Sequence, residues 1–144
     1  MEIIFATGNQ HKVVEAQKAL GDSFTLIMPK ELGLTEDIPE DGDTLVKNAV
    51  QKAEYLWNRF GKNCFADDTG LEVDALGGAP GVYTARYAGP DKGSDANMEK
   101  LLEELAAVEA IEGKGLRTAR FRTVVALIIN GETKIFEGVM EAEI

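Results

Sequence analysis

The chain is 144 residues long, with 44% hydrophobic residues, 28% charged residues and a formal net charge of −10. That length can bury a sizeable core, and we expect residues 1–144 to form a single domain. The acidic balance argues against a nucleic acid polymer as partner, since such binding needs a basic face. A small phosphate ligand remains possible, because local amides, a lysine and a divalent cation can hold it.

Cysteine usage and hydropathy indicate the compartment. Cys64 is the only cysteine, so no disulfide framework and no cysteine-based zinc site are expected, and a reducing compartment fits. The opening apolar run at residues 2–6 is too short for a signal peptide, and no run reaches transmembrane length. We therefore expect a cytoplasmic protein that does not associate with a membrane.

The first predicted unit is a strand, a polar turn and a helix. Ile3–Ala6 is typical of a buried strand, Thr7–Lys12 breaks it, and apolar residues return at helical spacing over Val13–Gly21. Helix N-terminal amides then lie beside the turn and could bind an anion. The alternative is an ordinary turn in which Thr7 or Asn9 caps the helix.

A second short strand is predicted at Phe24–Met28, followed by an acidic loop at Glu36–Asp43. The loop has two interpretations. It is either a solvated segment in which Asp43 or Thr44 caps the next helix, or it supplies a ligand for a hard cation, such as Glu40.

The helix predicted over residues 45–60 has an apolar stripe and ends at Gly61. Trp57 and Phe60 lie on that stripe and are expected in the core rather than stacked on a ligand. Asn48 lies near the stripe although it is polar. A buried Asn needs hydrogen-bond partners, so Asn48 either ties the acidic loop down or faces solvent.

Two adjacent carboxylates follow the next apolar run. If Cys64–Ala66 ends a buried strand, Asp67 and Asp68 lie where the strand meets a loop. Successive strand residues point to opposite faces, so at most one of the two faces the covered side of the sheet. A strand end is a usual place for chemistry in an α/β sheet, whereas the plain alternative is an Asx-turn.

A glycine-rich segment, residues 77–90, carries Arg86. It is either a surface loop or a segment that packs on a partner subunit or lines a cleft, with Arg86 available for phosphate. Ser94 or Asp95 can cap the helix that follows.

The end of the chain reads as a hairpin. Residues 117–130 have strand character, Asn130-Gly131 is a strong two-residue turn signal, and residues 133–139 form the return strand.

Four blocks in this order resemble the motifs of the inosine triphosphate pyrophosphatase family. The blocks are Thr7–Lys12, Glu40–Thr44 with Asn48-Ala49, Phe65–Leu71, and Ala75–Gly89. The resemblance implies an α/β fold with an elongated mixed sheet flanked by helices, two lobes and a central cleft. It also implies a homodimer that cleaves ITP, dITP and XTP between the α- and β-phosphates. The products would be a nucleoside monophosphate and pyrophosphate, which cleanses the nucleotide pool.

The resemblance also implies roles for single residues. Asp68 would be the general base, and Glu40 and Asp68 would hold Mg²⁺; we assign Asp67 a supporting role. Adjacent carboxylates leave open which is the base and which is a ligand or support. The residues of the first turn would bind the triphosphate, with Lys12 as the catalytic cation. The predicted substrate-binding residues are Thr7, Gly8, Asn9, Gln10, His11, Lys12, Thr69 and Arg86.

Family members continue with a glycine-rich F-G-Y-D-P segment, a later Lys and a terminal S-H-R, which are associated with base and ribose recognition. This sequence contains none of them, and His11 is its only histidine. We therefore expect a truncated or incompletely represented family member, which intact mass would check. If the truncation is real, turnover should be weak or absent and base selectivity poor. The alternatives are a triphosphate- and metal-binding fragment without turnover and a pyrophosphatase for other modified nucleotides. Pyrophosphate release across a nucleotide panel discriminates among them.

Overall fold

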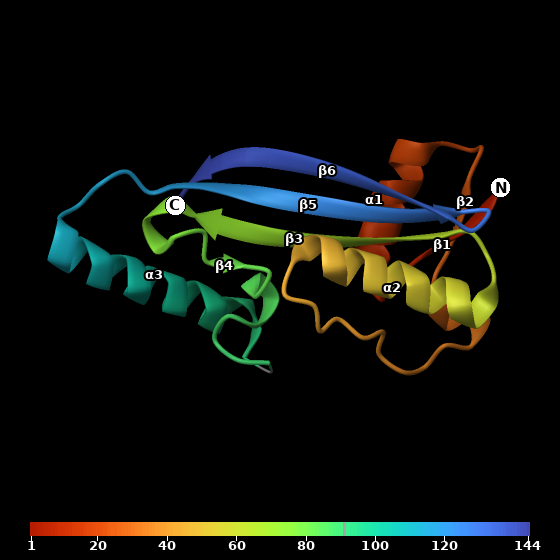
Figure 1. Ribbon diagram of the computed structural model, residues 1–144, viewed down its shortest axis with the longest axis horizontal. Helices are drawn as coiled ribbons and strands as arrows, with labels where there is room; N and C mark the ends of the chain where they lie inside the picture. Colours follow the sequence, from red (N-terminus) through yellow and green to blue (C-terminus); the bar gives the residue numbers. More distant parts are fainter. Residues whose placement is uncertain (91) are drawn as a thin grey trace. The chain divides into compact units, whose positions relative to one another are not determined.

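The computed structural model describes residues 1–90 and 92–144 and has a mixed α/β fold, as expected (Figure 1). One sheet has the strand order β2-β1-β3-β5-β6, and β4 pairs with β3 outside this path. β1 is parallel to β2 and β3, whereas β4 is antiparallel to β3. The elements are β1 Glu2–Phe5, α1 Gln10–Leu20, β2 Thr25–Ile27, α2 Leu45–Phe60, β3 Cys64–Val73, β4 Pro80–Gly81, α3 Gly93–Glu112, β5 Thr118–Ile129 and β6 Glu132–Glu143, with 3-10 turns at Pro29–Leu32, Asp74–Leu76 and Thr84–Arg86.

The chain forms two compact units. The first unit comprises Met1–Asp68 and Val124–Phe136, and the second comprises Thr69–Thr123 and Glu137–Ile144. In the described residues, no helix is long and apolar enough to cross a membrane.

The core of the first unit lies on both faces of its strands. On one face, Val13 of α1 packs with Ile3, Phe5 and Leu26. On the other face, the buried Cys64 thiol donates to the carbonyl oxygen of Ala53 in α2, at 3.2 Å. Phe65, which follows Cys64 in β3, packs against the first cluster instead, so successive residues of this strand meet different helices, as the period of two in a buried strand requires.

The predicted ends of the first two helices are confirmed. Asn9 caps α1 and Thr44 caps α2, each accepting hydrogen bonds from helix amides with its side-chain oxygen. Gly61 ends α2 in the left-handed conformation. These caps are local chemistry, which is why the sequence was sufficient to predict them.

The second unit has its own core of Leu71, Val73, Leu101, Leu105 and Ala119, in which α3 packs on β3 and β5. The predicted cap of α3 is wrong. The helix begins at Gly93 after Lys92, and no side chain caps it. Because the helix begins earlier than predicted, Ser94 and Asp95 lie inside its first turn. An acidic side chain there interacts favourably with the helix dipole and does not act as a cap.

The strand end predicted at Asp67 and Asp68 is also wrong, because β3 runs through both residues without a break from Cys64 to Val73. Asp and Gly are disfavoured in strands, but partners elsewhere in the fold outweigh that preference. Within β3 the buried positions change from Cys64 and Ala66 to Gly70, Leu71 and Val73, so the regular alternation is interrupted at the two carboxylates.

The predicted hairpin is confirmed, with a return strand that is longer than expected, Glu132–Glu143. Asn130 and Gly131 both have positive φ, 50° and 83°. Two such residues form the turn whose twist matches the flanking strands.

Replacing Gly131 with Ala should lower the free energy of unfolding by about 1 kcal/mol, because a Cβ is strained at positive φ. The new Cβ would lie 3.5 Å from Cζ2 of Trp57, an ordinary contact, so the cost comes from the backbone. Gly138→Ala in β6 is the matched control, since nothing lies within 4 Å of its Cβ and its φ is not positive. Urea denaturation should show a lower free energy of unfolding for Gly131→Ala alone. Equal free energies of unfolding for the two variants would contradict this prediction.

Candidate active site

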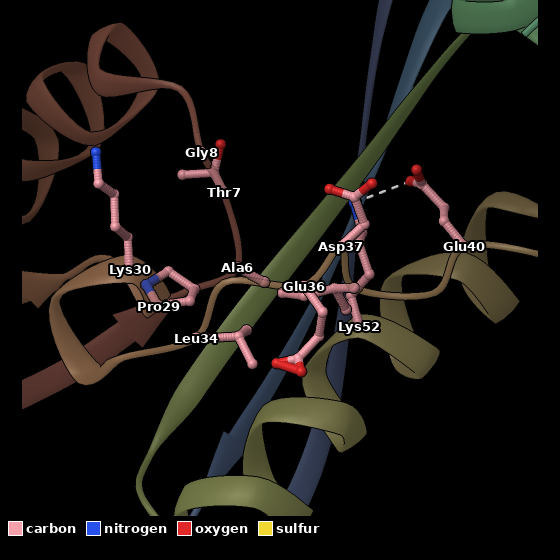
Figure 2. A pocket seen from close by; sticks show the side chains of 11 residues that line it. Ala6, Thr7, Gly8, Pro29, Lys30, Leu34, Glu36, Asp37, Glu40 and Lys52 are labelled. Carbon is pink, nitrogen blue, oxygen red and sulfur yellow. Dashed lines mark ion pairs between the residues drawn. The ribbon is translucent and has the colours of Figure 1, made fainter.

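A cavity of about 510 Å³ lies in the first unit, beside the β1–α1 turn, the acidic loop of residues 36–43 and α2 (Figure 2). Its polar lining includes Thr7, Gly8, Lys30, Glu36, Asp37, Glu40 and Lys52. A lining with charges of both signs suits an ionic ligand better than an apolar one.

The β1–α1 turn is held by its own side chains. Thr7 Oγ1 accepts from the amide of Asn9 at 3.1 Å. Asn9 Oδ1 accepts from the amides of His11 at 3.0 Å and Lys12 at 3.4 Å. Two of the helix N-terminal amides are therefore used by the cap, and Thr7 and Gly8 are the turn residues that face the cavity.

Lys12, the predicted cation, lies beside one of the central carboxylates. Its Nζ is 3.2 Å from Asp67 Oδ2, with side chains 48% and 16% exposed, respectively. The structure thus brings two predicted site residues together across 55 positions of sequence. An exposed ammonium that is already close to a carboxylate can exchange that partner for a phosphate oxygen at little cost.

Asp68 has a different partner. Its Oδ2 accepts from Nδ2 of Asn48 at 3.1 Å, and Oδ1 of the same amide accepts from the Gly42 amide at 2.7 Å. Asn48 is 1% exposed, so it is buried and hydrogen-bonded at both ends. The alternative that it ties the acidic loop down is confirmed, and the alternative that it faces solvent is wrong.

The pKa of Asp68 is raised from 3.8 to about 6. Partial burial is the largest cause, and the neighbouring carboxylate of Glu40 raises the pKa further. The Asn48 hydrogen bond and the Lys52 ammonium act in the opposite direction. The two carboxylates are therefore close enough to repel each other, an arrangement that a bound cation relieves.

Lys52 is the residue that the sequence analysis missed. Its side chain is 13% exposed, and its Nζ lies 3.0 Å from Glu40 Oε1 (Figure 2). The same ammonium donates to the carbonyl oxygen of Asp67. The available signal was its spacing: Lys52 follows Asn48 by four residues, so both polar groups lie on the same helix face.

The carboxylate pair fits a hard divalent cation. Mg²⁺ is usually held by one or two carboxylates together with substrate phosphates and waters, and Glu40 and Asp68 are such a pair. Over residues 1–90 and 92–144, no group of three or more His, Cys, Asp or Glu side chains is arranged to hold a metal. A cation here would take its other ligands from waters or, when substrate is bound, from phosphate oxygens.

The remaining predicted residues are placed as follows. Gln10 and His11 are exposed in the first turn of α1. Thr69 and Arg86 belong to the second unit, where Thr69 Oγ1 lies 2.8 Å from Thr123 Oγ1 and the Arg86 guanidinium lies 5.4 Å from the ring centre of Tyr83. Their roles toward a substrate stay predictions.

Comparison with known proteins gives one consistent result. A model of the Ham1 family matches residues 3–144. Proteins named dITP/XTP pyrophosphatase from Flavobacterium johnsoniae and Bacillus subtilis are each 46% identical to the chain; the match covers 100% and 99% of it and 72% and 71% of the relatives. The solved Ham1 protein of Coxiella burnetii has a TM-score of 0.90 at 36% identity, with all of this chain and 73% of that chain covered. The Staphylococcus aureus Ham1 protein has a TM-score of 0.86 at 37% identity, with coverages of 100% and 72%.

Proposed function

The chain belongs to the Ham1 family, and we propose from that membership that it is a nucleoside triphosphate pyrophosphatase. Its proposed substrates are the non-standard purine nucleotides dITP, XTP and ITP. The reaction is attack of water that yields the nucleoside monophosphate and pyrophosphate.

One observation carries the proposal: the Glu40 and Asp68 carboxylates lie beside the Lys52 ammonium, and the Lys12 ammonium lies on the adjacent Asp67, within one compact unit. Hydrolysis of a phosphoanhydride is limited by charge on the phosphate oxygens, so positioned cations are the main requirement. The chain thus supplies two cations, Lys12 and Lys52, and a carboxylate pair that would hold a third cation, the metal ion.

Asp68 is the proposed general base. Its pKa of about 6 leaves the carboxylate largely ionised at neutral pH, yet more basic than an ordinary Asp. Asp67 supports it by holding the Lys12 ammonium at 3.2 Å. Thr7, Gly8 and Asn9 shape the turn at which the triphosphate would bind.

Glu40 and Asp68 are the residues that would hold Mg²⁺. When bound, that ion would neutralise phosphate oxygens and orient the substrate. Lys52 already neutralises part of the same carboxylate charge by its ion pair with Glu40.

A nucleotide panel tests the proposed selectivity. Pyrophosphate release should be measured with dITP, XTP, ITP, ATP and GTP at equal concentration in Mg²⁺, with EDTA as the control. We expect release from the three non-standard nucleotides to exceed release from ATP and GTP. A preference for ATP, or release that EDTA does not reduce, would contradict the proposal.

We further propose that the protein is a homodimer in the cytoplasm, where the nucleotide pool for such a reaction lies. The single, buried cysteine is compatible with a reducing compartment. Size-exclusion chromatography with light scattering measures the subunit number directly.

A further inference from the structure

Asn48 is unusual in its surroundings. Among the described residues it is the only polar residue that is buried. It lies on the face of α2 that also carries the buried Leu45, Ala49 and Ala53. An apolar residue of similar size would fill the same space without the cost of burying an amide. The amide is therefore expected to do something that packing alone does not require.

Both ends of the amide are used, and the two partners come from different segments. Nδ2 donates to the Asp68 carboxylate on β3 at 3.1 Å, and Oδ1 accepts from the Gly42 amide at 2.7 Å. Gly42 lies two residues after Glu40 in the acidic loop. One planar group on a rigid helix thus fixes the position of one carboxylate directly and of the loop that carries the other.

Gly42 shows how closely the loop approaches this amide. A Cβ at position 42 would lie 2.8 Å from Asn48 Oδ1 and 2.8 Å from Lys47 Cβ, closer than Cβ atoms ordinarily come. Only a glycine allows the loop to reach Asn48, so a methyl group at this position would break one half of the bridge and leave the Asp68 half in place.

We propose that Asn48 is a positioning residue that holds Asp68 and the Glu40 loop at the spacing needed to bind one divalent cation. The reason for binding a cation here rests on the proposed function, but the inference itself concerns cation binding by the chain without nucleotide. Carboxylates held in place before a cation arrives lose less freedom when they bind it.

The test is Mn²⁺ binding to the nucleotide-free chain, followed by electron paramagnetic resonance, for three variants. Asn48→Ala removes both halves of the bridge, and Gly42→Ala displaces the loop alone. Gln51→Ala is the matched control, because Gln51 Oε1 also ties the loop to α2 by accepting from the Asp41 amide at 3.0 Å. We expect the Kd for Mn²⁺ to rise about tenfold or more in the first two variants, as for loss of other groups that orient metal ligands. In Gln51→Ala it should change less than about twofold, because the variant removes an exposed hydrogen bond without displacing the loop, whose Gly42 amide still donates to Asn48.

A merely structural Asn48 would lower the melting temperature of Asn48→Ala and leave Mn²⁺ affinity at the wild-type value, which would overturn the inference. If Asn48→Ala does not fold, Gly42→Ala decides: unchanged affinity overturns the inference, and weakened affinity supports it. Wild-type protein that binds no Mn²⁺ also overturns it. Asn48-dependent Mn²⁺ binding without pyrophosphate release from any nucleotide supports the inference and contradicts the proposed function instead.

Discussion

Asp68→Asn should reduce pyrophosphate release at least about 100-fold, the usual contribution of a general base, while raising the melting temperature of the metal-free protein at pH 8. The activity falls because Asn can neither accept a proton from water nor supply charge to a cation. The melting temperature rises because the variant removes a carboxylate that the fold disfavours when ionised.

The sign of the stability effect follows from the pKa. Asp68 has a pKa of about 6 in the folded protein and 3.8 as its ordinary value, so the folded state binds more protons between these values. Stability should therefore fall as pH rises from 4 to 6, and the ionised carboxylate remains unfavourable above pH 6. Allowing for solvent screening of a half-buried group, the gain for Asp68→Asn at pH 8 is about 1 kcal/mol, or about 3 °C.

Asp43→Asn is the control for this experiment. Asp43 lies in the same loop region, but its pKa is lowered by its hydrogen bond and ion pair with Lys47, so its ionised form is favoured. This variant should keep wild-type turnover and should not gain stability at pH 8. Retained turnover in Asp68→Asn, or a lower melting temperature at pH 8, would show that the role given to Asp68 is wrong.

Lys52→Met should lower the free energy of unfolding at pH 8 by about 2 kcal/mol, because it removes the largely buried cation that balances both Glu40 and the half-buried Asp68 carboxylate. The ammonium now lies 3.0 Å from Glu40 Oε1 and donates to the Asp67 carbonyl oxygen. Without it, the two carboxylates face each other unbalanced and the pKa of Asp68 should rise further. The decrease in the free energy of unfolding should be smaller at pH 5, where Asp68 is mostly protonated.

Lys47→Met gives a matched comparison, since it removes the same charge from the same helix. The Lys47–Asp43 pair is 65% and 69% exposed, and such pairs are worth less than about 1 kcal/mol. Urea denaturation of both variants at pH 8 and pH 5 makes the measurement. Equal losses for the two variants, or a Lys52→Met loss that does not depend on pH, would count against the electrostatic role of Lys52.

Local signals in the sequence predicted much of this molecule. The caps at Asn9 and Thr44 and the Asn130-Gly131 turn depend on neighbouring residues only, and each is confirmed. The cap of α3 was wrong because Gly93 begins the helix one residue before the first candidate.

Long-range contacts account for what the sequence did not reveal. The two central carboxylates were predicted to end a strand, but Lys12 and Asn48 contact them from 55 and 20 residues away, and the strand continues through them. The role of Lys52 likewise depends on where the acidic loop folds, which no local pattern states. The carboxylates were therefore identifiable from sequence, whereas the groups that balance and position them were not.

If Asp68 and Glu40 serve the proposed pyrophosphatase reaction, the protein should cleave dITP between the α- and β-phosphates, and the cleavage should depend on Asp68. The most direct test is ³¹P NMR of dITP incubated with the protein and Mg²⁺. We predict dIMP and pyrophosphate in equal amounts, and neither product with EDTA or with Asp68→Asn. Orthophosphate and dIDP as products, or unchanged pyrophosphate release from Asp68→Asn, would contradict the claim.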